Sequence, residues 1–298
     1  MHPRGRILLL LDRTAVLFIG LGAGLVIAFS FVGGGEGRGG EAQAVSPPPA
    51  QAVRAVGPGE IPAPRLARAF AERRRVQIGV FGDSFGDGVW AGLYNKLRSD
   101  PRFEVRQYSE RSTGFTRYRS LNILSDVRAK LDRQPVDIAV LSFGANDTQG
   151  IFEDGHGNAY MSDGWQRIVS GRVGDVVGLL RERGATVYWV GLPRMRDPAF
   201  DADIQQMNRF YAERMAALDV PYIDTVPMTV DANGDYAPYL PLEPGRSERQ
   251  AARTNDGIHM TIPGYIHLVG GLSDRFREAA DRAEANAAPA NAAAGAAG

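Results

Sequence analysis

The stretch that most constrains the fold is residues 76–88, VQIGVFGDSFGDG. Its first half alternates apolar side chains as a buried strand does, and its second half is rich in glycine and carries Asp83 and Ser84. Apolar residues then recur at helical spacing as far as Leu97. The stretch therefore predicts a strand, a tight turn and a helix, with Ser84 at the helix N-terminus. Free backbone N–H groups favour an anion at that position.

An isolated Gly-Asp-Ser would more often do no more than cap the helix. The rest of the chain therefore decides whether Ser84 carries chemistry. Short apolar strands alternate with amphipathic helices beyond Leu97. Strands are expected at 104–108, 137–143, 186–192 and 221–226, and helices at 165–180, 203–218 and 263–283. Apolar strands separated by helices predict an α/β fold with a parallel sheet, which binds ligands at the carboxyl ends of its strands.

Three later segments place polar residues beside such strand ends. Gly114 follows the second strand, where the lack of a side chain lets a backbone N–H approach a ligand. Asn146 follows the third strand and could direct an amide N–H₂ into the same cleft, although Asn and Asp also favour turns. Asp256 and His259 lie three residues apart before the last helix, a spacing that can place a carboxylate against an imidazole.

The N-terminal residues 1–32 are predicted to be a membrane anchor or signal segment. Arg4, Arg6 and Arg13 precede residues 14–32, which carry no charge and whose 19 residues would reach about 28 Å as a helix. The basic flank predicts a cytoplasmic N-terminus and export of the rest. A signal peptide cleaved after residues 42–44, Ala-Gln-Ala, is the alternative. The distance of that site from the apolar run favours an uncleaved anchor.

Composition divides the remainder and excludes several classes of function. Residues 33–75 are rich in Gly, Pro and Ala and are expected to be a tether, residues 76–283 a folded domain, and residues 284–298 a disordered Ala-rich tail. The 34 basic residues balance 34 acidic ones, which argues against a nucleic-acid partner. The absence of cysteine excludes a thiol nucleophile, disulfides and thiolate metal sites.

In order along the chain, Gly82-Asp-Ser84, Gly114, Gly144-Ala-Asn-Asp147 and Asp256-Gly-Ile-His259 resemble the four sequence blocks of the SGNH (GDSL-like) hydrolases. The wider pattern, including residues 191–195, is similar to a bacterial subfamily of exported SGNH proteins. The resemblance implies a three-layer α/β/α flavodoxin-like sandwich with a five-stranded parallel sheet. It also implies that Ser84 is the nucleophile, His259 the general base and Asp256 the residue that orients His259. The oxyanion hole would be formed by the backbone N–H groups of Ser84 and Gly114 and the side-chain amide of Asn146.

Four further residues are assigned from their places in the sequence. Asp83 and Asp147 match block positions and are interpreted as supporting the turns. Arg194 and Arg253 lie near predicted strand ends and are candidates for contact with substrate. No metal or cofactor is expected.

The function implied is a membrane-anchored serine esterase of the cell envelope, acting on acyl esters such as the O-acetyl groups of a glycan. An O-acyltransferase using the same triad on an envelope polysaccharide is one alternative, and a non-catalytic glycan-binding or assembly module is another. The expected location is the bacterial inner membrane, as a single-pass protein with a periplasmic catalytic domain. Secretion to the periplasm is the alternative.

Overall fold

The computed structural model describes residues 63–295, except residues 73 and 244. The predicted anchor at residues 1–32 and most of the predicted tether lie outside these residues. None of the helices in the described part combines the length and the apolar composition that a membrane span needs. The two predictions about the N-terminus therefore stay predictions.

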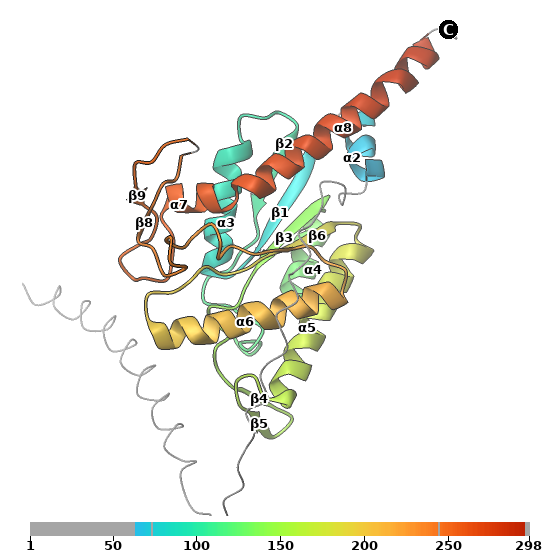
Figure 1. Ribbon diagram of the computed structural model, residues 1–298. Helices are drawn as coiled ribbons and strands as arrows, with labels where there is room; N and C mark the ends of the chain where they lie inside the picture. Colours follow the sequence, from blue (N-terminus) through green and yellow to red (C-terminus); the bar gives the residue numbers. More distant parts are fainter. Residues whose placement is uncertain (1–62, 73, 244, 296–298) are drawn as a thin grey trace, which may run out of the picture. The chain divides into compact units, whose positions relative to one another are not determined.

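The centre of the fold is a five-stranded sheet in the order β2-β1-β3-β6-β7 (Figure 1). Its strands are β1 Val76–Gly82, β2 Phe103–Gln107, β3 Ile138–Ser142, β6 Thr186–Val190 and β7 Tyr222–Ile223. Neighbouring strands pair in parallel throughout. In this order the chain reverses direction across the sheet between β1 and β3, and flavodoxin-like sheets bind ligands at that point.

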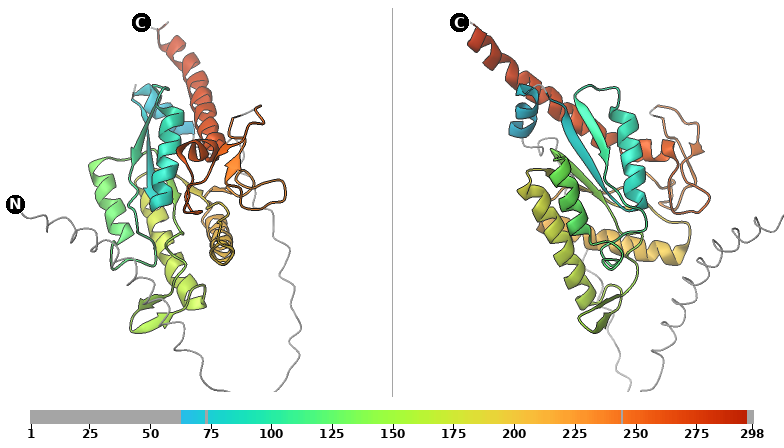
Figure 2. Two further views of the ribbon diagram at one scale, coloured as in Figure 1. Left: turned by 90° about the vertical axis from the view of Figure 1, so that its left-hand side faces the viewer. Right: turned by 180° about the vertical axis from the view of Figure 1, so that it is seen from behind.

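Helices cover both faces of the sheet, as the two views in Figure 2 show. The first layer contains α2 Ala63–Ala71, α3 Ser84–Leu97, α7 Ile262–Leu268 and α8 Gly270–Gly295. The second layer contains α4 Ile123–Arg133 and α5 Asp163–Glu182. Helix α6 Pro198–Ala217 packs mainly against the core of the second layer. Strand side chains alternate between the two cores: Val140 and Tyr188 face the first, and Leu141 and Trp189 the second. The predicted three-layer α/β/α fold is confirmed.

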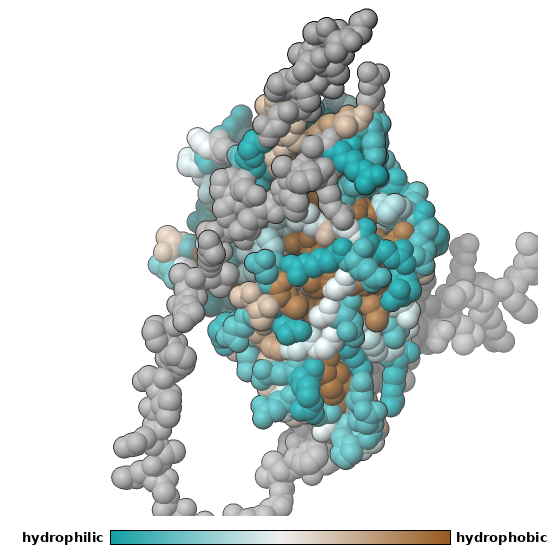
Figure 3. All heavy atoms as spheres, turned by 90° about the vertical axis from the view of Figure 1, so that its right-hand side faces the viewer, coloured by the Kyte–Doolittle hydropathy of each residue, from teal (hydrophilic) through white to brown (hydrophobic). Residues whose placement is uncertain are grey.

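The surface outside these cores is mixed. On the face drawn in Figure 3, hydrophobic residues gather near the centre among mostly hydrophilic ones. Two small antiparallel hairpins add to the loops at the carboxyl ends of the strands. One, β4 Ile151–Glu153 with β5 His156–Asn158, follows β3, and the other, β8 Tyr239–Leu240 with β9 Gln250–Ala251, follows β7.

The structure differs from the predicted domain boundaries at both ends. Residues 63–71, expected to belong to the tether, form α2 and pack against α8, with Leu66 only 2% exposed. Leu66, Ala69 and Phe70 share the face that packs on the core, but a helix of nine residues is too short a pattern to separate it from the tether in the sequence. The helix expected to end at Ala283 continues to Gly295, because alanine, which suggested disorder by its abundance, is also the best helix former.

Smaller differences lie within the domain. The helix expected from residue 203 begins at Pro198, because Asp197 caps it by accepting the backbone N–H of Phe200 at 2.8 Å. The last predicted helix is divided into α7 and α8 at Val269. The strand expected at 221–226 keeps only two paired residues, Tyr222 and Ile223.

Candidate active site

Ser84 is the first residue of α3, directly after the turn that ends β1. Asp83 caps the helix by accepting the Phe85 N–H at 2.8 Å. Gly82 does not need a left-handed backbone here, since its φ is not positive. Instead, a Cβ atom on Gly82 would lie 2.3 Å from the Ser142 carbonyl oxygen of β3. Glycine therefore lets the turn pack directly onto the neighbouring strand, which places Ser84 at the point where β1 and β3 diverge.

Asp256 and His259 lie in one tight loop before α7. The Oδ1 atom of Asp256 accepts the backbone N–H groups of Ile258 at 2.8 Å and His259 at 2.9 Å, and the Thr254 hydroxyl at 2.6 Å. Gly257 has φ = 73°, a conformation that favours glycine. These bonds leave Asp256 Oδ2 free to face the imidazole, which it contacts at 2.7 Å from Nδ1.

The other imidazole nitrogen meets the serine. His259 Nε2 lies 2.8 Å from Ser84 Oγ, although the residues are 175 positions apart in the sequence. A proton on Nδ1, donated to Asp256, leaves Nε2 as the acceptor for the serine hydroxyl. The ring of Phe85 stacks on the imidazole with centroids 5.3 Å apart, which fixes the plane of the ring. The structure thus brings the three residues of the predicted triad into one chain of contacts.

The carboxyl group of Asp256 is prepared to carry a charge. Burial alone would raise the pKa of Asp256, but hydrogen bonds from the Thr254 hydroxyl, the His259 ring and the backbone N–H groups of Ile258 and His259 hold it well below its usual range. The carboxylate is therefore ionised at neutral pH and can stabilise an imidazolium beside it.

The predicted oxyanion donors Gly114 and Asn146 lie in adjoining loops. One N–H of the Asn146 side-chain amide is donated to the Thr113 carbonyl oxygen at 2.9 Å, and the second remains for another acceptor. No described residue accepts the backbone N–H of Gly114. Both groups therefore retain a donor, and their role toward an oxyanion stays a prediction.

Two buried carboxyl groups support these loops from below. Asp147 accepts the backbone N–H groups of Phe115 at 3.1 Å and Thr116 at 2.8 Å, and also the Thr116 hydroxyl at 2.7 Å. Burial raises the pKa of Asp147, and it raises the pKa of Asp83 to about 7, where the Phe85 N–H opposes the rise and the nearby charge of Asp147 adds to it. The contacts agree with the interpretation that Asp83 and Asp147 support turns.

The prediction that Arg253 contacts substrate is wrong. Its side chain is buried, and the residue is only 5% exposed. The guanidinium donates to the backbone carbonyl oxygens of Arg194 at 2.6 Å and Ile258 at 2.7 Å, with the Tyr236 ring 4.8 Å from it. Arg253 therefore ties the loop of Asp256 and His259 to the loop after β6. Arg194 itself pairs with Asp201 at 3.1 Å and is partly exposed, so its contact with substrate stays a prediction.

Two residues that hold the histidine loop could not be recognised in the sequence. Thr254 donates to Asp256, and the Arg196 guanidinium donates to the backbone carbonyl oxygens of Asn255 at 3.0 Å and Asp256 at 3.2 Å. A side chain that bonds backbone carbonyls leaves no recognisable spacing in a sequence. In the part of the chain with assigned structure, no three His, Asp or Glu side chains are grouped as metal ligands.

Comparison with known proteins gives one family and several similar folds. Residues 77–275 match the profile of a family described as "Protein of unknown function (DUF459)". No curated protein matches the chain. A GDSL-like lipase from Bacteroides thetaiotaomicron is 16% identical with a TM-score of 0.47, over 73% of this chain and 98% of its own. The periplasmic domain of a lipopolysaccharide acetyltransferase from Salmonella Paratyphi A is 10% identical with a TM-score of 0.49, over 71% and 87%. An acetyl xylan esterase, AlAXEase, is 16% identical with a TM-score of 0.43, over 68% and 99%.

Proposed function

The chain belongs to the family described as a protein of unknown function (DUF459), an SGNH-like family, and from this premise we propose that it is a serine esterase working through an acyl-serine intermediate. The observation that carries the proposal is the continuous contact from Asp256 through His259 to Ser84. It places a base against a nucleophile and a charged carboxylate against the base, which is how a serine hydroxyl is activated. A module that only binds glycan has no need of this contact.

In the first half of the reaction, Ser84 Oγ attacks the ester carbonyl carbon while His259 Nε2 takes the hydroxyl proton. The carbonyl oxygen becomes an oxyanion, which the N–H groups of Ser84, Gly114 and Asn146 would stabilise. The imidazolium, held by Asp256, then gives its proton to the departing alkoxide. An alcohol leaves, and the acyl group remains on Ser84.

In the second half, His259 takes a proton from water as the water oxygen attacks the acyl carbon. Collapse of the second oxyanion breaks the bond to Ser84, which recovers its proton from the imidazolium. The products are a carboxylic acid and the free enzyme. A sugar hydroxyl in place of the water would make the same protein an O-acyltransferase, and the acceptor alone distinguishes the two reactions.

The substrate and location that we propose are an O-acetylated glycan of the cell envelope and the outer side of the bacterial inner membrane. The location is supported by Arg4, Arg6 and Arg13 before the uncharged residues 14–32, which lie outside the described residues. An envelope glycan is the ester-bearing polymer that an enzyme held there would meet.

The decisive experiment is mass spectrometry of the intact protein mixed with p-nitrophenyl acetate. We expect an added acetyl group on Ser84, lost over time to water, and neither acetylation nor turnover in Ser84→Ala. Ser125→Ala, which removes an exposed serine hydroxyl from α4, is the matched control and should behave as the parent. A folded Ser84→Ala protein with parental turnover would overturn the proposal. Repeating the reaction with an added oligosaccharide shows whether water or sugar receives the acetyl group.

Fractionation of cells that express the full chain tests the location. We expect the protein in the membrane fraction, with its hydrolase domain digested by protease added to spheroplasts. A mature soluble protein that begins near Val45 would overturn the anchor and leave export intact.

A further inference from the structure

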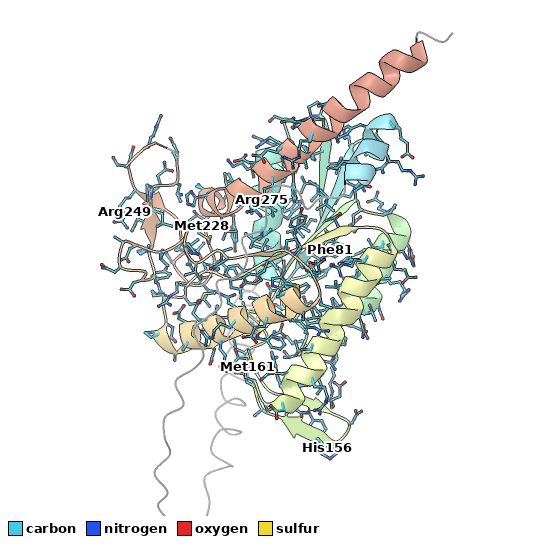
Figure 4. All side chains as sticks on the ribbon, turned by 45° about the vertical axis from the view of Figure 1, so that its right-hand side comes forward. Phe81, His156, Met161, Met228, Arg249 and Arg275 are labelled. Atoms are coloured by element: carbon cyan, nitrogen blue, oxygen red, sulfur yellow. The ribbon has the colours of Figure 1, made fainter. Side chains whose placement is uncertain are left out.

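A cavity lies beside the loop that follows Gly114, and no residue of the triad lines it. It has a volume of about 400 Å³, and its walls include Thr116, Tyr118, Arg119, Phe152, Asp154 and Arg172. These residues come from the loop after Gly114, from the β4–β5 hairpin and from α5. Figure 4 shows the hairpin, marked by His156, at the lower end of α5. The volume falls in the range of about 300–1,000 Å³ that small-molecule sites occupy.

An exposed aromatic ring lines this cavity. Phe152 is 60% exposed, the largest exposed fraction among the big hydrophobic residues of the described chain. It lies on a three-residue strand of the hairpin, and the Arg119 guanidinium is 5.8 Å from the centre of its ring. Tyr118 adds a second ring, which the Arg172 guanidinium covers at 4.1 Å. An aromatic ring that stays largely exposed to water costs hydrophobic free energy, which a ligand covering it would recover.

The polar groups around the ring offer both donors and acceptors. Arg172 and Glu153 pair with each other, so their charges are compensated within the wall. Neither Arg119 nor Asp154 forms an ion pair with any residue whose position the structure assigns. A guanidinium and a carboxylate without an ion-pair partner in the described chain, beside an aromatic face, suit a ligand with an apolar side and many hydroxyl groups.

The wall of the cavity is continuous with the predicted oxyanion loop. Arg172 donates to the carbonyl oxygen of Phe115 at 2.6 Å, and Phe115 follows Gly114 in the sequence. Thr116, also in the wall, is fixed by its hydroxyl and its backbone N–H to Asp147. A ligand in this cavity would therefore lie against the loop that also carries the Gly114 N–H.

We propose that this cavity is a saccharide subsite, in which a sugar ring stacks on Phe152 while Arg119 and Asp154 bond its hydroxyl groups. The C–H groups on one face of a pyranose are apolar and pack flat on an aromatic ring, while its hydroxyl groups point outward to polar partners. The subsite rests on the proposed function, because it would hold the glycan chain whose ester reaches Ser84. It assigns the carbohydrate specificity to the β4–β5 hairpin.

The test measures binding without turnover. Full-length Ser84→Ala protein is titrated calorimetrically with three probes: xylotetraose, chitotetraose and trigalacturonic acid. We expect at least one probe to bind, and Phe152→Ala in that background to weaken it at least about tenfold. Phe152→Tyr, which keeps the ring, should restore binding. Tyr94→Ala removes an exposed aromatic ring from α3 and is the matched control, expected to bind as the parent.

The outcomes separate this subsite from the esterase proposal. Binding of none of the probes, or binding that Phe152→Ala leaves unchanged, would overturn the subsite. Turnover of p-nitrophenyl acetate by the protein with intact Ser84 tests the esterase separately. A protein that binds saccharide through Phe152 but forms no acyl-serine would keep the subsite and lose the esterase.

Discussion

Gly114 lies directly on the carboxylate of Asp147, so that a Cβ atom added to the glycine would come within 2.4 Å of Asp147 Oδ1. Asp147 also accepts hydrogen bonds from the next two backbone N–H groups, those of Phe115 and Thr116. A buried side chain from the loop after β3 thus fixes the position of the loop after β2. The position of the predicted oxyanion donor depends on this contact.

The first prediction follows from that contact. In Gly114→Ala the new methyl group must displace either the loop or Asp147, and the Gly114 N–H moves with the loop. We expect turnover of p-nitrophenyl acetate to fall by about 10²-fold or more, as when an oxyanion donor is lost. Gly171→Ala, where a methyl group on α5 meets open space, is the control and should keep the parental rate. Parental turnover in Gly114→Ala would show that its N–H stabilises no oxyanion.

The second prediction concerns Asp83 and stability against pH. Burial raises its pKa to about 7 in the folded state, whereas an unfolded Asp titrates near pH 4. The folded state therefore holds more protons between these values, and this group makes the free energy of unfolding fall as the pH rises from about 4 to 7. Above pH 7 its contribution is constant.

Asp83→Asn removes this titration and keeps an oxygen that can cap α3. Because one pKa unit corresponds to about 1.4 kcal/mol, we expect the variant to gain at least about 1 kcal/mol over the parent between pH 5 and pH 8. Urea unfolding at the two pH values measures this gain. Asp235→Asn, which alters an exposed carboxyl group, is the control. A gap between variant and parent that is equal at both pH values would contradict the prediction.

The third prediction tests the corrected role of Arg253. In Arg253→Met the carbonyl oxygens of Arg194 and Ile258 lose their buried donor, at a cost of about 1–3 kcal/mol for each group left unsatisfied. We therefore expect a lower Tm together with a lower kcat, since the His259 loop loses its attachment. Arg246→Met, at a largely exposed position between β8 and β9, should change neither value. An unchanged Tm with a raised KM alone would restore the prediction that Arg253 contacts substrate.

The parts of this protein that the sequence predicts are those encoded by local patterns. Alternating strands, the glycine turn before Ser84 and the Asp256–His259 spacing depend on neighbours within a few residues, and they predicted an α/β fold with a parallel sheet. The three-layer arrangement and the meeting of the triad were implied by the resemblance to the SGNH hydrolases. The role of Arg253 could not be predicted in this way. Its partners are backbone carbonyls up to 59 residues away, and any residue type at those positions would serve.

The predicted boundaries at the two ends of the domain were wrong for a different reason. α2 is stable because it packs on α8, more than 190 residues later in the chain, and the short apolar face of α2 does not reveal such a partner in the sequence. The two strands of the β4–β5 hairpin likewise have three residues each, too few for a periodic pattern, yet the hairpin lines part of the proposed saccharide cavity. Tertiary contacts decide structure at these places.

The last prediction separates the roles of Asn146 and Asp256. Asn146→Ala removes a donor that does not titrate, so we expect the chemical step to lose about 2.7–4 kcal/mol of transition-state stabilisation with an unchanged pH profile. Asp256→Asn can keep the backbone bonds of the loop through its remaining oxygen. Its N–H₂ group would then face His259 Nδ1, which favours the tautomer whose Nε2 cannot accept the Ser84 proton. A loss on the order of 10⁴-fold in kcat is expected from such a change.

The pH dependence distinguishes the two variants where their rates alone would not. Activity falls in acid because an imidazolium cannot take the serine proton, and in the parent the charged Asp256 favours that imidazolium. Asp256→Asn removes the negative charge that favours the imidazolium, so the acidic limb of the rate profile should move to lower pH in Asp256→Asn and stay in place in Asn146→Ala. Rate profiles of kcat/KM for parent and both variants, from pH 4 to 9 with p-nitrophenyl acetate, measure this. Equal shifts in both variants, or a shift in Asn146→Ala alone, would mean that the two roles are assigned to the wrong residues.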